Sequence, residues 1–277
     1  MRSSFCFAGS ANWLKNTLSV ACLSAGLLMT QAASATTVQF QTVLGNFEVN
    51  LFDKTTPKTV ANFLTYVNAG AYDNTIVHRS VKDFVIQGGG YKFNGELPLV
   101  QAPQNAAVEN EPVYSNLRGT IAMAKLGGRP NSATNQWFIN LNNKNATDKT
   151  HAYILDNNNG GFTVFGQVMG EGMVVVDAIA ALSRFNVGIF DDFPLRDYSA
   201  ADMTANKPVT GDNLVLIEKV VVLNADPDTA ATLNPVKNTL INEKDDKKDS
   251  GSGSFGLLGL LALALVALGR KSLLNKA

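Results

Sequence analysis

The chain is poor in the residues that carry redox, nucleophilic and metal chemistry. It has two cysteines, Cys6 and Cys22, and two histidines, His78 and His151, among 277 residues. Both cysteines lie in the first 35 residues, which we expect to be removed, so the mature protein would hold no thiol to pair, oxidise or bind a metal. The carboxylates show no metal-ligand spacing. The sequence therefore predicts no metal and no cofactor.

An excess of either charge is also missing. The 23 lysines and arginines balance the 23 aspartates and glutamates, and no basic stripe is interleaved with aromatics. Such a chain has no surplus positive field to neutralise phosphates. The composition therefore argues against nucleic acid as a partner.

The first 35 residues have the layout of a secretory signal peptide. Arg2 and Lys15 precede an apolar run over 18–29, and Ala33-Ser34-Ala35 follows it. The run is too short to cross about 30 Å of hydrocarbon, which argues against a transmembrane helix. We expect signal peptidase to cleave after Ala35 and the protein to be exported. Lipidation at Cys22 is disfavoured because Ser19 stands where such motifs have leucine.

The other end of the chain resembles a C-terminal sorting tail. Residues 225–254 are polar and end in a Gly-Ser spacer, so they are expected to form a flexible linker. Residues 255–271 are an apolar segment closed by Arg270 and Lys271. The order is that of the Gly-Gly-type signals of some Gram-negative bacteria, which a rhomboid-like protease is thought to cut. A plain tail anchor is the alternative, and periplasm, membrane, cell surface and medium all remain open as locations.

Residues 36–224 are expected to form one mainly β domain. Pro57 opens a helical pattern that ends at Gly70, and a second apolar helix is expected over 172–182. Residues 183–213 read as an aromatic-rich loop packed over the barrel. Residues 37–40 and 45–51 alternate apolar and polar residues as the two strands of a hairpin do. Six further strands are expected to complete a closed antiparallel barrel of eight, capped by the two helices, at 76–81, 84–88, 120–124, 137–141, 164–168 and 214–222.

Three sequence blocks within this domain carry a family resemblance. The first is VHRSVKDFVIQGGG over 77–90, where strand alternation puts Val77, Arg79 and Val81 on one face and Val85 and Gln87 on one face after a bend. The second is GTIAMAK over 119–125 with SATNQWFIN over 132–140, and the third is YILD over 153–156 with FTVFGQV over 162–168. Their order and spacing resemble the cyclophilin family of peptidyl-prolyl cis/trans isomerases. The resemblance runs from about Thr37 to about Leu223.

The resemblance implies a cyclophilin-like barrel with a site for proline-containing peptide segments. Arg79 would donate hydrogen bonds to the twisted amide of the substrate, with Phe84 and Gln87 as the other catalytic positions. The implied substrate-binding residues are the walls of a proline pocket, a second amide and two main-chain partners, namely Val85, Phe138, Leu155, Phe162, Gln136, Ala124 and Lys125. Only the backbone of Lys125 is expected to take part.

Phe162 and Ile154 depart from the pattern of eukaryotic members, whereas His78 precedes the arginine as in many relatives. Phe162 stands where eukaryotic members have a histidine, so no imidazole acid/base step is implied. Ile154 occupies the place of a tryptophan that donates to cyclosporin, and weak cyclosporin binding is expected. His78 is expected to be structural and to point away from the face of Arg79.

Two functions remain in view from the sequence. The first is an exported isomerase that accelerates X–Pro rotation in folding envelope or secreted proteins. The second is a peptide-binding chaperone that keeps the groove while turnover is incidental. The effect of Arg79→Ala on biological function, as opposed to turnover alone, would distinguish them.

Overall fold

The computed structural model describes residues 36–147, 154–224 and 233–241. The expected leader, the expected C-terminal apolar segment and His151 lie outside these ranges. Within them, no helix is both long and apolar enough to cross a membrane.

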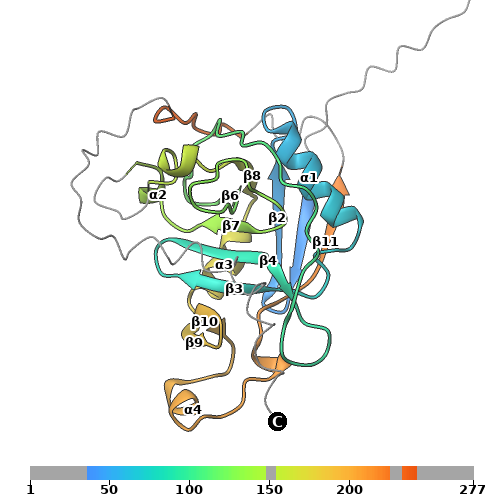
Figure 1. The fold of residues 1–277 in the computed structure, drawn as a ribbon, viewed down its shortest axis with the longest axis vertical. Coiled ribbons are helices and arrows are strands. Elements are labelled where there is room, and N and C mark those ends of the chain that lie inside the picture. Colours follow the sequence, from blue (N-terminus) through green and yellow to red (C-terminus); the bar gives the residue numbers. More distant parts are fainter. Residues whose placement is uncertain (1–35, 148–153, 225–232, 242–277) are drawn as a thin grey trace, which may run out of the picture. The chain divides into compact units, whose positions relative to one another are not determined.

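Eight antiparallel strands close into a ring (Figure 1). The ring order is β3-β11-β1-β2-β8-β6-β7-β4, and β3 pairs with β4 to close it. A two-residue strand, β5 (Val100–Gln101), adds to β4 outside the ring. The predicted eight-stranded barrel is confirmed, with strands at β1 (Thr37–Thr42), β2 (Gly45–Leu51), β3 (Thr75–Val81), β4 (Val85–Lys92), β6 (Thr120–Met123), β7 (Trp137–Asn140), β8 (Val164–Val168) and β11 (Leu216–Asn224).

The β1–β2 hairpin shows how local chemistry sets the register. The Thr42 hydroxyl donates to the Gly45 carbonyl oxygen at 2.6 Å and accepts from the Leu44 backbone N–H at 3.1 Å. Gly45 has φ +118°, a conformation that L side chains rarely adopt. This turn pairs Phe40 with Phe47, whose rings stack at 4.8 Å inside the barrel.

Both predicted long helices form and put side chains into the core. Helix α1 (Pro57–Asn68) begins with proline in its first turn, where the missing N–H costs nothing. It contributes Phe63 to the core, and α3 (Gly172–Ala180) contributes Val176 and Ile179. Two further short helices, α2 (Lys144–Thr147) and α4 (Ala200–Thr204), were not predicted.

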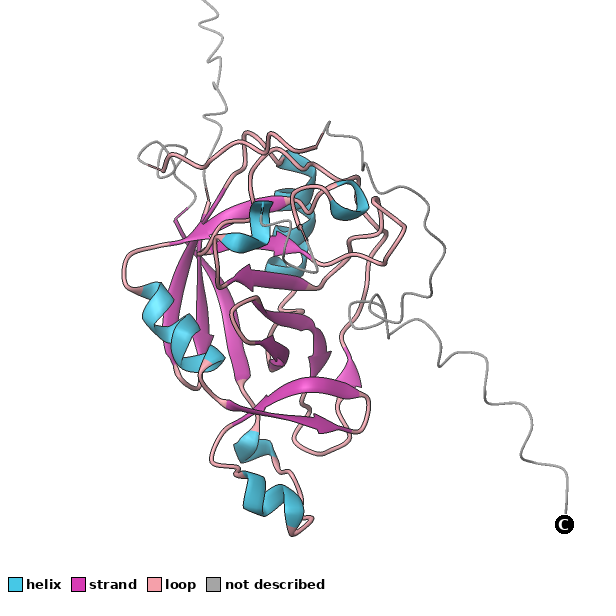
Figure 2. Cartoon of the chain, turned by 90° about the vertical axis from the view of Figure 1, so that its left-hand side faces the viewer, coloured by secondary structure: helices cyan, strands magenta, loops and turns pink. Residues whose placement is uncertain are grey.

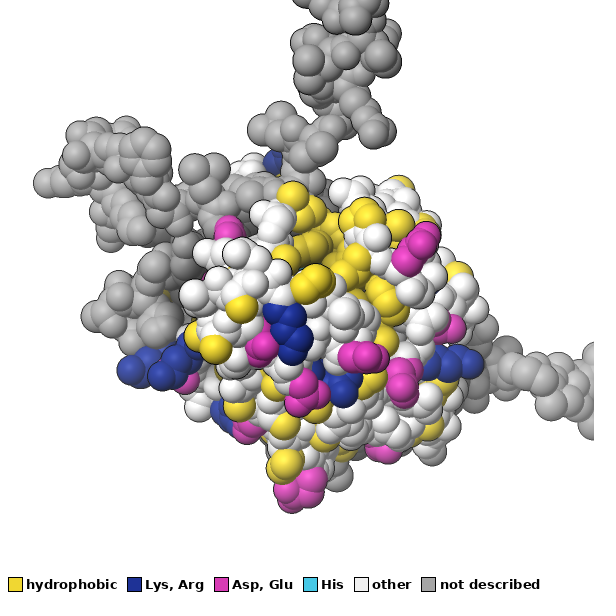
Figure 3. Space-filling model, turned by 90° about the horizontal axis from the view of Figure 1, so that it is seen from below, with side chains coloured by type: hydrophobic (Ala, Val, Ile, Leu, Met, Phe, Trp, Pro, Cys, Tyr) yellow, Lys and Arg dark blue, Asp and Glu magenta, His cyan; other side chains and the backbone are white. Residues whose placement is uncertain are grey.

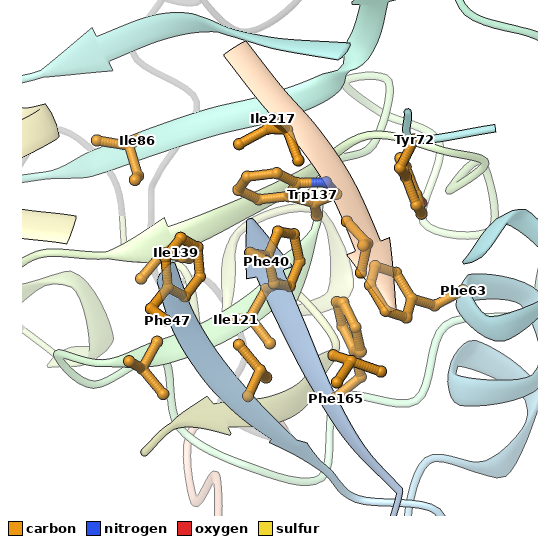
Figure 4. Packing of buried hydrophobic residues seen from close by; sticks show 14 of the residues in the cluster. Phe40, Phe47, Phe63, Tyr72, Ile86, Ile121, Trp137, Ile139, Phe165 and Ile217 are labelled. Carbon is orange, nitrogen blue, oxygen red and sulfur yellow. The ribbon is translucent and has the colours of Figure 1, made fainter. Parts of the chain in front are cut away.

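Trp137 is fully buried in the main core, which is the apolar cluster that also holds Phe40, Phe63 and Val77 (Figure 4). Its ring meets Phe40 edge-on at 5.0 Å. A Cβ added at Gly88 would stand 2.7 Å from the Trp137 ring, so this glycine is what lets β4 approach the indole. Large aromatic area buried in this way supplies much of the stability of a small barrel.

The segment 183–213 differs from the predicted loop. It contains a hairpin of β9 (Ser183–Val187) and β10 (Phe190–Leu195), followed by α4 and a short 3-10 turn over Gly211–Asn213. As expected, it packs on the barrel: Phe193, Leu195 and Tyr198 are buried with Ile76 and Tyr91. Figure 2 shows the helices and strands of the barrel from the side.

Residues 233–241, here called the strap, were predicted as part of a flexible linker but pack against the domain. The Asn238 N–H donates to the Val113 carbonyl at 2.9 Å, and the Ser115 N–H donates to the Val236 carbonyl at 2.9 Å. Asn238 is buried, and Leu233 packs against apolar residues of the barrel. Polar composition reads as linker, but here the polar groups bind backbone atoms of the domain.

Candidate active site

The site begins at the tight turn between β3 and β4. Asp83 has φ +54°, and the Phe84 N–H donates to the Val81 carbonyl at 3.1 Å. This turn is the predicted bend, and it places Arg79 directly opposite Gln87. Residues opposite each other in an antiparallel pair share a face, so the two side chains lie on the same side of the sheet.

One part of the predicted strand alternation is wrong. The pairing shifts between Val77 and Arg79, because Val77 faces Gly88 while Arg79 faces the adjacent Gln87. His78 is therefore the extra residue of a β-bulge, which turns Val77 to the opposite face from Arg79. Val77 is accordingly buried in the main core. Val81 and Val85, which also face each other, share the face of Arg79 and Gln87 as predicted.

A row of directly opposed residues extends from Arg79 across the outer face of the barrel. Gln87 faces Phe138 on β7, and Phe138 faces Ala122 on β6. Ala122 in turn faces Val164 on β8. The sheet register thus brings an arginine, an amide and an aromatic ring from three strands into line.

The two predicted amides meet at the centre of this face. Nε2 of Gln87 donates to Oε1 of Gln136 at 2.9 Å. A Cβ at Gly90 would stand 2.8 Å from Cδ of Gln136, so the third glycine of the 88–90 run makes room for this side chain. The predicted Gln87–Gln136 pair is present in the structure.

An apolar cluster lies beside the row, and we call it the outer apolar cluster. The edge of the Phe138 ring meets Phe162 at 5.7 Å with a 73° angle between the planes. Ala124 is partly buried against the cluster. The cluster brings together all five predicted pocket side chains with three further residues, in full Phe52, Phe84, Val85, Ala122, Phe138, Leu155, Phe162 and Val164.

A buried chain of polar side chains, which the sequence interpretation missed, supports the cluster from behind. Nδ2 of Asn145 donates to the Phe84 carbonyl at 2.7 Å and to Oδ1 of Asn140 at 2.8 Å. Nδ2 of Asn116 donates to Oδ1 of Asp156 at 3.0 Å and to the Phe162 carbonyl at 3.2 Å. Nδ2 of Asn140 bonds Oδ1 of Asn116 at 3.3 Å, which joins the two halves. The backbones of Phe84 and Phe162 are therefore tied together through side-chain amides.

Two ionisable side chains near the site, Lys125 and His78, are buried. Only the backbone of Lys125 is expected to take part, but the residue is 7% exposed and its Nζ donates to the Asn159 carbonyl at 2.9 Å. Burial lowers the pKa of Lys125 to about 8. Burial first, and then the Arg79 cation, lowers the pKa of His78 to about 4, so the imidazole is neutral at pH 7 and packs against Tyr91 at 5.3 Å.

No group of three or more His, Cys, Asp or Glu side chains among the described residues is placed to hold a metal.

The end of the molecule that carries β9, β10 and α4 in Figure 1 shows charges of both signs among apolar side chains (Figure 3). The side chains that the site brings together are hydrogen-bond donors, the arginine cation of Arg79 and aromatic walls.

Comparisons with known proteins identify the family of the chain. Residues 37–202 match the family model described as cyclophilin type peptidyl-prolyl cis-trans isomerase/CLD. The chain is 37% identical over 176 residues to a peptidyl-prolyl cis-trans isomerase of Acinetobacter baylyi, covering 63% of this chain and 88% of the relative. It is 34% identical over 170 residues to peptidyl-prolyl cis-trans isomerase B of Escherichia coli, covering 61% and 99%.

Among solved structures, a cyclophilin type peptidyl-prolyl cis-trans isomerase of Cryptosporidium parvum aligns with a TM-score of 0.48 and 23% identity, over 68% of this chain and 98% of that one. The family match covers the strands that carry Arg79, Gln87 and Phe138, and the relatives share the activity in their names. The chain belongs to the cyclophilin family and is a peptidyl-prolyl cis/trans isomerase.

Proposed function

We propose that this isomerase accelerates X–Pro rotation in exported proteins as they fold, and that Arg79 is the group that stabilises the twisted amide. The single observation that carries the catalytic assignment is the row Arg79–Gln87–Phe138, which sets a cation beside an amide pair and an aromatic wall. Export rests on the layout of residues 1–35.

The reaction needs no nucleophile. Rotation about an X–Pro amide passes a twisted state about 18–20 kcal/mol above the ground state because resonance is lost. A catalyst has only to bind that state more tightly than the planar one. As resonance is lost, the imide nitrogen becomes pyramidal and its lone pair becomes an acceptor, to which a guanidinium can donate.

The neighbouring residues set the orientation in this proposal. The proline ring packs on the outer apolar cluster at Phe84, Phe138, Leu155 and Phe162. The Gln87–Gln136 pair holds the guanidinium and the substrate backbone in place, and the main chain at Ala124 and Lys125 pairs with the extended peptide. A planar, permanently charged fork suits Arg79, whereas a lysine would lack the second donor direction.

Arg79→Ala and Arg79→Lys test the assignment, with Arg184→Ala on β9 as the matched control. Isomerisation of a Xaa-Pro peptide would be followed by NMR exchange, which needs no coupling protease. We expect both Arg79 variants to lose at least about a hundredfold in kcat/KM, while Arg184→Ala keeps the wild-type value. Wild-type acceleration by Arg79→Ala would overturn the role of Arg79.

The peptide-binding alternative makes a different prediction in cells. If turnover is the function, Arg79→Ala abolishes the effect of the protein on folding of exported clients; if binding is the function, that effect survives. Export itself is tested by fractionation and by N-terminal sequencing of the mature chain, which we expect to begin at Thr36. Signal peptidase is thus a proposed partner, and a rhomboid-like protease is one for the C-terminal tail.

A further inference from the structure

The side chain of Lys125 is buried without an acidic partner. It follows Ala124 just beyond β6 and is only 7% exposed. Lysine is almost never buried unless its ammonium is hydrogen-bonded. Here Nζ donates to two backbone carbonyls, that of Asn159 at 2.9 Å and that of Gly161 at 2.5 Å.

These carbonyls belong to the loop between two residues of the outer apolar cluster, Leu155 and Phe162. The loop turns through Gly160 and Gly161, with φ of +74° and +69°. Nζ of Lys125 also stands 4.7 Å from the centroid of the Phe162 ring. One cation therefore engages the loop backbone and the aromatic ring at its end.

We propose that the Lys125 ammonium is a positioning group of the isomerase site, which holds the 156–162 loop and the Phe162 ring in the geometry that receives the substrate proline. This inference rests on the proposed role of the outer apolar cluster. The inference adds Lys125 to the proposed site, as a residue whose side chain acts through Phe162 rather than on the substrate.

The other charged groups on adjoining segments are engaged elsewhere. The Asp156 carboxylate accepts from the Asn116 N–H at 2.7 Å, and Glu111 accepts from the Thr59 hydroxyl at 2.8 Å. Glu109 is paired with Lys58, and Arg129 lies in an exposed part of the 126–132 loop. Asn110 donates to the Gly161 carbonyl at 2.8 Å, so this carbonyl has a neutral donor as well as the cation.

Deprotonation of Lys125 separates activity from stability. The neutral amine loses the attraction to the Phe162 ring and weakens both carbonyl bonds, so activity should fall as the pH rises through about 8. The folded-state pKa of Lys125 is below the ordinary lysine value of 10.5, so the folded state holds fewer protons between those pH values and stability should rise there. A merely structural lysine would move activity and stability together.

The test compares the full chain with Lys125→Met, which keeps the length but removes the charge, and Lys125→Arg, which keeps the charge. Lys219→Met, on the exposed side of β11, is the control. We expect Lys125→Met to lower kcat/KM about tenfold at pH 7, mainly through KM, with a flat profile from pH 6 to 9.5. The wild type should fall to that level above pH 8, and Lys125→Arg should stay high and flat.

Two results would overturn the proposal. One is a Lys125→Met variant with wild-type kcat/KM at every pH. The other is an equal, pH-independent loss in Lys125→Met and Lys125→Arg, which would leave only packing. If Lys125→Met does not fold, the pH profiles of the wild type and of Lys125→Arg still test the proposal. A wild-type kcat/KM that does not fall above pH 8 relative to Lys125→Arg would overturn it.

A second readout separates this proposal from the proposed function. Selective labelling allows the lysine ε-carbon of Lys125, the Leu155 methyls and the Phe162 ring to be followed by NMR during a pH titration. We expect the Leu155 and Phe162 signals to shift with the midpoint of Lys125. A wild type without isomerase activity would refute the proposed function. Leu155 and Phe162 signals that stay unchanged while Lys125 titrates would refute the positioning role.

Discussion

Nε2 of Gln87 donates to Oε1 of Gln136 at 2.9 Å, and this single bond joins β4 to the residue that precedes β7. Gln136 can lie there because Gly90 of β4 has no side chain: a Cβ at Gly90 would stand 2.8 Å from the Cδ atom of Gln136. The glycine run of the first sequence block thus serves the amide pair as well as the core.

The first prediction concerns Gly90→Ala. The new methyl should displace the Gln136 side chain and lower kcat/KM about tenfold. The free energy of unfolding should change by less than about 1 kcal/mol, because the displaced atoms end a flexible side chain. Gly88→Ala is the comparison: its methyl meets the buried Trp137 ring and should cost about 1–3 kcal/mol of stability. Unchanged kcat/KM in Gly90→Ala would show that the amide pair is dispensable.

The second prediction concerns His78 and acid. The folded-state pKa of about 4 lies below the ordinary histidine value of 6.5, so the stability linked to this residue is complete above pH 6.5 and is lost as the pH falls from 6.5 to 4. The loss should reach about 3 kcal/mol. Denaturant unfolding at pH 7 and pH 4 measures it.

The control for this pH effect uses the other histidine of the chain. His78→Phe should reduce the difference in unfolding free energy between pH 7 and pH 4, because it removes the titrating ring while keeping an aromatic against Tyr91. His151→Phe should leave the difference intact. An unchanged difference in His78→Phe would assign the acid sensitivity to other groups.

The third prediction concerns the strap. Nδ2 of Asn238 donates to the Asp156 carbonyl at 2.7 Å in a buried position. Asn238→Ala should lower the free energy of unfolding by about 1–2 kcal/mol, because it leaves that carbonyl without this donor. Thr239→Ala, at the exposed neighbouring position, should be neutral. Equal stabilities of the two variants would mean that the strap does not support the domain.

The fourth prediction concerns cyclosporin. Ile154 lies beside Leu155 of the outer apolar cluster and has no side-chain donor, unlike the tryptophan at this place in sensitive relatives. We expect inhibition only at concentrations far above the nanomolar range, measured as the inhibition constant in the peptide assay. A nanomolar constant would show that the ligand needs no donor at this position.

The sequence was sufficient to predict the strands, turns and helices that depend on local residue patterns. The hairpin at Gly45 and the helix that starts at Pro57 follow from residue types that act within a few positions. The bulge at His78 could not be predicted in the same way, because it arises from the pairing of β3 with β4. Strict alternation therefore put Val77 on the wrong face.

The parts of the site that escaped prediction depend on distant partners. The carbonyls that accept hydrogen bonds from Lys125 lie 34 and 36 residues further along the chain, and no residue pattern near Lys125 predicts them. The strap reads as linker because its composition is polar, whereas its contacts with Val113 and Asp156 span more than 80 residues. The β9–β10 hairpin was hidden by Gly188, two aspartates and Pro194, which favour loops.

The closed ring has a consequence for the proposed role of this isomerase with unfolded client chains. Such chains are rich in unpaired backbone groups and readily add to any long free strand edge. Of the strands in the ring, each is paired on both sides, and the strand added outside it, β5, is two residues long. The barrel can therefore present an apolar face without a long free strand edge on which unfolded chains could pair, which is compatible with the proposed role in folding.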